Sequence, residues 1–214
     1  ALKHSPELHL IAGDMQEIGR DNEVITQSVL AKHNLLDQFQ KNQSVPINNA
    51  LAKLVIKNFI PTGTVLVKRA TLINAGLFNT TIRFGEDLEL WAKIAANHAI
   101  TCLPTILMLR RLHDQNATKY TTLMLIDLVK VMQSISLYAK EALNRQHINE
   151  NNLVADSFNN LGYWYFVNEN YQLATTAFWN ALKEKINTRS LTYLIASQLP
   201  HSIINKIRNI KKSK

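Results

Sequence analysis

Cysteine is nearly absent from this chain of 214 residues, which contains only Cys102. A single cysteine excludes a disulfide framework and a zinc site built from several thiolates. Cys102 lies in the apolar run of residues 100–103, so we interpret it as a small, buried side chain within a strand. Such cysteine usage is typical of a reducing compartment, and we expect a cytoplasmic protein.

Long apolar runs are also missing. No stretch of about 18 apolar residues occurs, so the sequence predicts no membrane-spanning helix. The formal net charge is +8, but the excess lies at one end, because residues 185–214 contain Lys and Arg and no acidic residue. A basic character confined to one end, with no recognised motif and no aromatic platform for bases, argues against nucleic-acid binding.

The pattern of apolar residues changes near residue 120. Before it, short β-branched runs at 8–12, 64–67, 99–103 and 106–109 alternate with helical spacing at 47–57, 68–75 and 86–97, which is typical of an α/β domain. After it, every segment has helical spacing, including a long helix over about 121–144. We therefore predict an α/β domain at 1–120, a helical module at 121–200 and a basic tail at 201–214.

Four short motifs follow one another between residues 59 and 118. They are Phe59-Ile60-Pro61-Thr62-Gly63-Thr64-Val65-Leu66-Val67-Lys68-Arg69, Ala75-Gly76-Leu77-Phe78-Asn79, Gly85-Glu86-Asp87-Leu88-Glu89-Leu90-Trp91, and Arg111-Leu112-His113 with Asn116 and Thr118. In this order and spacing they resemble the acceptor-side half of family 2 glycosyltransferases, which have the GT-A fold. The resemblance implies a partial GT-A-type mixed sheet with helices, and an inverting transfer of a sugar from a nucleotide-sugar donor to a hydroxyl, in polysaccharide or cell-surface glycan synthesis.

The resemblance assigns the catalytic base to Asp87. Inverting transfer needs a carboxylate that accepts the proton of the attacking hydroxyl, and a place at a helix N-terminus keeps a carboxylate ionised. Glu86, Trp91 and Thr64 are the implied acceptor-binding residues. Trp91 follows Asp87 by four residues and so shares its helical face, although a core aromatic is the alternative interpretation.

The resemblance also implies a loop that binds the nucleotide diphosphate through Arg111, His113 and Thr118, with a mobile polar loop as the alternative. His113 is a candidate ligand for the Mn²⁺ or Mg²⁺ ion of such enzymes. The family holds that ion through an Asp-x-Asp motif, which this sequence lacks. We therefore expect the chain by itself to hold no metal securely and to lack the donor site, as an incomplete fragment of the enzyme.

Residues 155–188 resemble a tetratricopeptide repeat. The positions that characterise this repeat are occupied by Phe158, Leu161, Gly162, Tyr165, Ala174, Phe178 and Ala181. A second repeat begins near residue 189 and stops at Pro200, so this tetratricopeptide-like extension is too short for a long solenoid. A protein-interaction module that uses this hairpin is the alternative to an enzyme.

The segment 201–214 places Ile203, Ile204, Ile207 and Ile210 on one helical face among basic residues. A basic amphipathic segment can lie on an anionic membrane surface, so a peripheral position on the inner face of the membrane, near a lipid-linked acceptor, is one hypothesis. A solvated terminus is the other.

Overall fold

The computed structural model describes residues 5–41, 45–113 and 121–199, and it is a mixed α/β structure. The chain forms two compact units, residues 1–149 and 150–214. The division therefore lies some 30 residues beyond the predicted boundary at 120. The reason is that helix α6 (Thr121–Tyr138) packs on helix α5 (Glu86–Asn97) of the α/β unit. The segments 114–120 and 201–214 lie outside the described residues.

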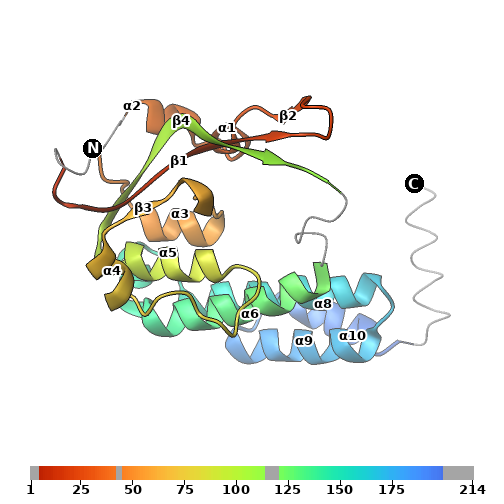
Figure 1. Ribbon diagram of the computed structural model, residues 1–214. Coiled ribbons are helices and arrows are strands. Elements are labelled where there is room, and N and C mark those ends of the chain that lie inside the picture. Colours follow the sequence, from red (N-terminus) through yellow and green to blue (C-terminus); the bar gives the residue numbers. More distant parts are fainter. Residues whose placement is uncertain (1–4, 42–44, 114–120, 200–214) are drawn as a thin grey trace. The chain divides into compact units, whose positions relative to one another are not determined.

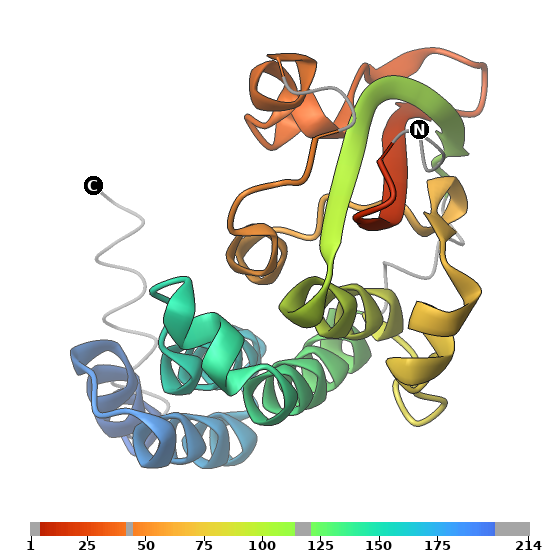
Figure 2. The same cartoon turned by 90° about the vertical axis from the view of Figure 1, so that its left-hand side faces the viewer.

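Strand β1 (Leu8–Ile18) is the centre of a four-stranded sheet. Strand β4 (Ala99–Arg111) runs parallel to it along one edge, and the two lie side by side in both ribbon views (Figures 1 and 2). The other edge pairs antiparallel with β3 (Leu66–Val67) near its start and with β2 (Val24–Thr26) near its end. Because β1 is paired on both edges and covered on its faces, it is buried almost throughout.

Helices α3 (Ala50–Ile56) and α5 lie on the same side of the sheet, and α6 lies beyond α5 (Figure 1). Helix α5 is thus enclosed between the sheet and α6, and it is apolar on more than one face, as an enclosed helix must be. The largest fully buried side chains of this unit are Leu8, Leu10, Leu30, Leu51, Leu54, Phe59, Leu90, Trp91, Ile94, Ile100 and Ile135.

Short helices complete the first unit: α1 (Val29–Lys32), α2 (Leu36–Lys41), a 3-10 turn η1 (Thr62–Thr64), α4 (Arg69–Asn74) and α7 (Lys140–Arg145). Two predicted regions are divided differently in the structure. The predicted strands 99–103 and 106–109 form the single strand β4, and the predicted helix 121–144 is divided into α6 and α7 at Ala139. Gly76, just after α4, has the left-handed φ of +90° that commonly ends such a helix.

The second unit is a helical hairpin, α8 (Glu150–Val167) and α9 (Tyr171–Glu184), followed by α10 (Thr188–Ser197). Phe178 of α9 packs on Gly162 of α8, where an added Cβ atom would lie 2.9 Å from the ring. The Phe178 ring also stacks on Tyr193 of α10, with 5.4 Å between the ring centroids. One phenylalanine therefore joins all three helices.

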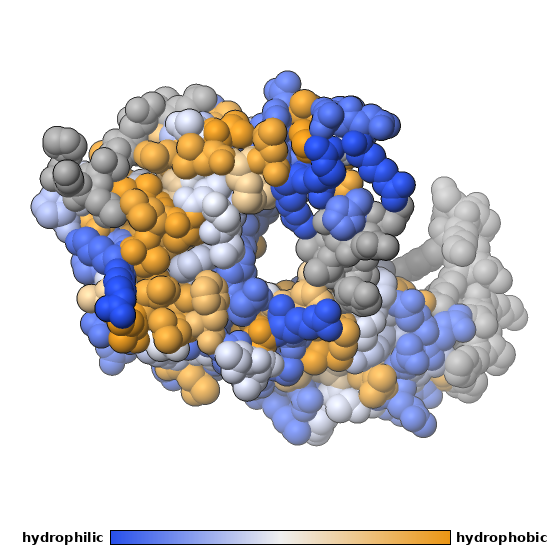
Figure 3. Space-filling model, viewed as in Figure 1, coloured by the Kyte–Doolittle hydropathy of each residue, from blue (hydrophilic) through white to orange (hydrophobic). Residues whose placement is uncertain are grey.

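Apolar side chains also reach the surface. Figure 3 shows them gathered over β3 and α4, where Leu66, Ile73, Leu77 and Phe78 are among the exposed large hydrophobic residues. Within the residues that the structure describes, no helix is long and apolar enough to cross a membrane.

We predict that Gly162→Ala destabilises the second unit. Alanine favours a helix over glycine by about 1 kcal/mol, but the added methyl group must displace the Phe178 ring, and overpacking typically costs about 1–3 kcal/mol. Urea denaturation should show a lower free energy of unfolding. Phe178→Leu in the Gly162→Ala background should recover part of the loss, whereas a more stable single variant would contradict this packing.

We predict that stability falls as the pH drops below about 6.5. His9 stacks on His98 with 4.0 Å between ring centroids, and its Nδ1 lies 2.6 Å from the Thr71 hydroxyl. Burial, followed by the charges of His98 and Lys68, lowers the pKa of His9. The unfolded chain therefore takes up this proton first, so the stabilisation is present above the unfolded pKa of about 6.5 and is lost as the pH falls toward the folded pKa.

The measurement is the melting temperature between pH 7.5 and 5 for the wild type and His9→Gln. Burial also lowers the pKa of His33, with Lys57 and Lys32 acting in the same direction, so part of the dependence should remain in the variant. An identical pH dependence of the melting temperature in the two proteins would show that the His9–His98 stack does not contribute to it.

Candidate functional site

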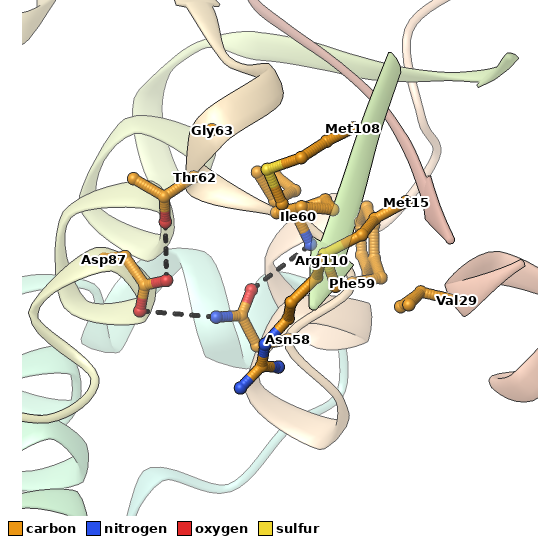
Figure 4. Close-up of a pocket in the computed structure, with 11 residues that line it drawn as sticks. Met15, Val29, Asn58, Phe59, Ile60, Thr62, Gly63, Asp87, Met108 and Arg110 are labelled. Carbon is orange, nitrogen blue, oxygen red and sulfur yellow. Dashed lines mark hydrogen bonds between the residues drawn. The ribbon is translucent and has the colours of Figure 1, made fainter. Parts of the chain in front are cut away.

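A cavity of about 360 Å³ opens between α5, the segment 58–63 and the strands β1 and β4. Figure 4 shows its residues, with Asp87 and Thr62 at one side and the two strands at the other. Its lining is an apolar surface that carries one carboxylate, one guanidinium and the polar groups of Asn58 and Thr62. The lining residues are Met15, Val29, Asn58, Phe59, Ile60, Pro61, Thr62, Gly63, Asp87, Met108 and Arg110.

Asp87, the predicted base, is the second residue of α5 and lies in this wall. Its Oδ1 accepts the backbone N–H of Leu88 at 2.6 Å and the Asn58 amide at 3.4 Å. Its Oδ2 accepts the hydroxyl of Thr62 at 2.7 Å (Figure 4). The carboxylate is thus held in one orientation by three donors, at a helix N-terminus whose dipole favours a negative charge.

The backbone before Asp87 explains how the helix begins there. Gly85 caps α5 with a left-handed φ of +83°, a conformation that suits glycine. An added Cβ atom on Gly85 would also lie 3.3 Å from Val131 of α6. Both constraints favour glycine immediately before the Glu86-Asp87 pair.

The segment 58–63 supplies the side chains that hold Asp87. Asn58 accepts the backbone N–H of Ile60 through its Oδ1 at 3.3 Å, so its amide nitrogen is turned toward Asp87. Phe59 is fully buried and anchors the segment beneath the cavity. Thr62 opens the η1 turn, which places its hydroxyl above the carboxylate.

The opposite wall is made by alternate residues of the two strands. Met108 and Arg110 of β4 and Met15 of β1 line the cavity, since every second side chain of a strand faces the same side. Arg110 Nη1 lies 3.5 Å from Glu17 of β1, its direct partner in the ladder. Arg110 thus contributes a positive charge to the cavity wall, although the sequence motifs pointed to Arg111 and not to Arg110.

Glu17 is buried and also binds Lys32 at 3.1 Å and the Thr26 hydroxyl at 2.8 Å. Burial alone would raise the pKa of Glu17, but the hydrogen bonds from Thr26 and Lys32, together with the charges of Lys32 and Arg110, lower it. One carboxylate therefore faces two cations in this cluster.

Arg111, predicted to contact a diphosphate, has other partners. Its guanidinium donates to the backbone oxygens of Gly19 and Arg20 at 2.7 and 3.1 Å, and to the Asn22 side chain at 2.7 Å. These bonds close the turn between β1 and β2. Arg111 follows Arg110 directly and so emerges on the other face of the strand, outside the cavity lining.

The three predicted acceptor-binding residues do not line the cavity either. Trp91 is 2% exposed and packs edge-on against Phe78, so its ring is buried in the core. Thr64 donates to the backbone oxygen of Pro61 at 2.8 Å and accepts the N–H of Gly13 at 3.1 Å, so it fastens η1 to β1. Glu86 is the first residue of α5, next to Asp87.

His113 follows β4 and is exposed, and Thr118 lies outside the described residues. Among residues 5–41, 45–113 and 121–199, no three His, Cys, Asp or Glu side chains come together in a group that could hold a metal ion. The described residues therefore do not fit the Mn²⁺ or Mg²⁺ site that the motifs imply, and no step of a reaction is derived through such an ion.

A buried carboxylate supports the cavity from behind. Asp14 accepts the backbone N–H groups of Met15 and Leu30 at 2.7 and 3.1 Å, and the Ser28 hydroxyl. These bonds fix α1 beside β1, and Val29 and Met15 both face the cavity. Burial, with the charge of Asp14, raises the pKa of nearby Cys102 to about 12, so this thiol is a packing group, as predicted.

A second carboxylate fixes the turn that leads into α5. Asp127 of α6 accepts the backbone N–H groups of Arg83 and Phe84 at 3.0 and 3.2 Å, and the Lys130 ammonium at 2.6 Å. Burial alone would raise the pKa of Asp127, but the bonds from Lys130, Arg83 and Phe84 outweigh it and lower the pKa. The sequence motifs gave no indication of this contact, because it joins residues 43 or more positions apart.

No protein-family model and no curated protein matches this chain. Function is therefore inferred from the cavity and from the motifs of the sequence.

We predict that Asp127→Ala lowers the free energy of unfolding by about 2 kcal/mol, since it leaves two backbone N–H groups without their acceptor. Asp127→Asn keeps an oxygen that can accept both groups and loses the ion pair with Lys130, so it should cost less. Urea denaturation of the two variants measures the difference. Equal stabilities would mean that the turn does not depend on Asp127.

Proposed function

We propose that this chain is the acceptor-side part of an inverting glycosyltransferase of the GT-A type, with Asp87 as the general base. One observation carries the proposal: the Asp87 carboxylate lies in the wall of a cavity and is oriented by Thr62, Asn58 and the Leu88 N–H. The motifs at 59–69, 75–79 and 85–91 support it. The helical hairpin of α8 and α9 is proposed to be a tetratricopeptide-like extension.

In this reaction an acceptor hydroxyl in the cavity attacks the anomeric carbon of the donor sugar. As the new C–O bond forms, the hydroxyl proton passes to an oxygen of Asp87. The bond between the anomeric carbon and the diphosphate breaks, and the nucleoside diphosphate leaves with the electron pair. Because attack and departure occur on opposite faces, the configuration at the anomeric carbon is inverted.

The surroundings of Asp87 suit a base of this kind. The Thr62 hydroxyl, the Asn58 amide and the Leu88 N–H all donate to the carboxylate, so it is kept in place without a bound acceptor. A carboxylate already held in position loses little entropy when the acceptor binds. On this proposal the donor and its metal are bound by residues outside this chain, which contains no Asp-x-Asp sequence.

We predict that Asp87→Asn in the native host lowers sugar transfer by about 100-fold or more, because general-base catalysis typically contributes about 10²–10⁴-fold. The measurement is incorporation of radiolabelled sugar from a panel of nucleotide sugars into the glycan of isolated cell envelopes. Using the host retains any segment or partner that supplies the donor site.

Asp37→Asn is the matched control, because Asp37 is exposed on α2 and does not line the cavity. Immunoblotting should show equal amounts of both variants. If Asp87→Asn incorporates sugar at the wild-type rate at equal protein level, Asp87 is not the base and the proposal fails.

A further inference from the structure

We infer that the cavity binds an acceptor sugar that carries a methyl group, which lies against Met15 and Met108 while one hydroxyl of the sugar donates to Asp87. The inference rests on the proposed function, because it takes the ligand of Asp87 to be the acceptor sugar. It adds the chemical class of the acceptor and the two residues that select it.

The Asp87 carboxylate has room for one hydroxyl of a ligand. A carboxylate has about four lone-pair sites. Oδ1 accepts two hydrogen bonds, from the Leu88 N–H and the Asn58 amide, and Oδ2 accepts one, from the Thr62 hydroxyl. These are the donors that the described residues supply, so the site that remains is on Oδ2. The acceptor hydroxyl therefore donates to Oδ2, and this oxygen receives the proton during transfer.

Two further polar side chains line the cavity, and each has a partner in the protein. Asn58 uses both ends of its amide, which donates to Asp87 and accepts the Ile60 N–H. Arg110 forms an ion pair with Glu17 at 3.5 Å. The wall therefore favours a ligand with few hydroxyl groups on the side that faces it, because a hydroxyl that is buried without a partner is unfavourable.

Two methionines form the surface that receives the methyl group. Met15 of β1 and Met108 of β4 are direct partners in the ladder, so their side chains leave the sheet next to each other on the cavity side. Val29 of α1 extends this surface beside Met15 (Figure 4). A thioether side chain is polarisable and adapts its shape, so it packs well around a small apolar group.

The η1 turn holds the Met108 side chain across the cavity. An added Cβ atom on Gly63 would overlap the Met108 sulfur, so glycine at this position leaves the space that the thioether fills. Figure 4 shows Met108 reaching from β4 toward this turn, where Thr62 lies beside Asp87. The apolar surface thus continues from the strands to the side of the carboxylate.

The size of the cavity allows one sugar unit to meet both groups. Its volume of about 360 Å³ lies near the lower end of the range of small-molecule sites, which is roughly 300–1,000 Å³. A ring in this space that donates a hydroxyl to Asp87 presents its other side to the methionines. A methyl group there removes apolar surface from water on both partners, which is favourable.

The methyl group has two chemical sources. In a 6-deoxyhexose it replaces the primary hydroxyl group of the sugar, and in an N-acetyl sugar it ends an acetamido group. The first removes a hydroxyl that would need a partner in the wall, whereas the second adds an amide. The shared feature is a methyl group on the side of the ring opposite the reacting hydroxyl.

The experiment is a titration of the full chain labelled with ¹³C in the methyl groups of its four methionines. The probes are glucose, 6-deoxyglucose and N-acetylglucosamine. At least one methyl-bearing sugar should bind about tenfold more tightly than glucose, as expected when a single carbon enters an apolar pocket. The signals of Met15 and Met108 should shift, while those of Met124 and Met132 on α6, outside the lining, should not. Whichever methyl-bearing sugar binds more tightly identifies the source.

Met108→Gln should abolish the preference of about tenfold over glucose, because it places a polar amide where the methyl group lies. Met108→Leu keeps an apolar side chain and should retain most of the preference. Met124→Gln is the matched control, since Met124 is also half-buried but lies on α6 outside the lining. It should leave the preference unchanged, and unshifted methionine signals elsewhere show that each variant is folded.

Three results would overturn the inference: glucose binding as tightly as both methyl-bearing sugars, a preference that survives Met108→Gln, or no change of the Met15 and Met108 signals with any probe. None of these involves transfer, so the inference can fail while Asp87 remains essential for incorporation. If Asp87→Asn instead incorporates sugar at the wild-type rate while the methionine signals respond, the proposed function fails and the methyl-binding surface remains.

Discussion

The parallel pairing of β1 with β4 is the contact on which the cavity depends. It joins residues about 90 positions apart in sequence, and its register places Arg110 beside Glu17 and Met108 beside Met15. Helix α5 ends at Asn97, two residues before β4 begins, so the same register fixes where the helix lies and brings its N-terminus to the cavity. For this reason the carboxylate of Asp87 on α5 and the guanidinium of Arg110 on β4 line the same cavity.

Local chemistry determined the elements that the sequence predicted well. Helix α5 has the predicted bounds, since acids fill its first turn and a glycine with positive φ precedes it. Tertiary contacts decided the others. The predicted strands 99–103 and 106–109 form one strand, because Pro104 falls where the ladder skips between Cys102 and Ile106. A proline, which has no N–H to donate, is tolerated at such a position. The break between α6 and α7, after Tyr138, could not be predicted because no glycine or proline lies there.

The residues of the candidate site also divide into those that the local sequence predicts and those that depend on tertiary contacts. Asp87 could be selected from its motif, because the acid and its helix are adjacent in sequence. The choice of Thr62 over Thr64, and of Arg110 over Arg111, depends on which way a short turn and a strand present their side chains. In each pair both residues are chemically equivalent, and only the η1 turn and the β1–β4 register distinguish them. The support from Asp127 is a long-range contact, beyond what spacing along the chain can indicate.

Because Arg110 and Arg111 are neighbours on β4, a change in the length of this strand would alter which side chain lines the cavity. The ladder already contains irregular steps near Ala12 and Asp14, so a one-residue insertion or deletion could be accommodated between Pro104 and Arg110. Such a change turns every following side chain to the opposite face. After a deletion, Arg111 would take the place of Arg110 in the cavity wall and Leu112 that of Arg111. After an insertion, Arg110 would take the place of Arg111 beside the turn at residues 19–22 and Leu109 that of Arg110. A slip of one residue therefore costs this strand either the guanidinium in the cavity wall or the one that closes the turn, so the length of β4 up to Arg110 is tightly constrained.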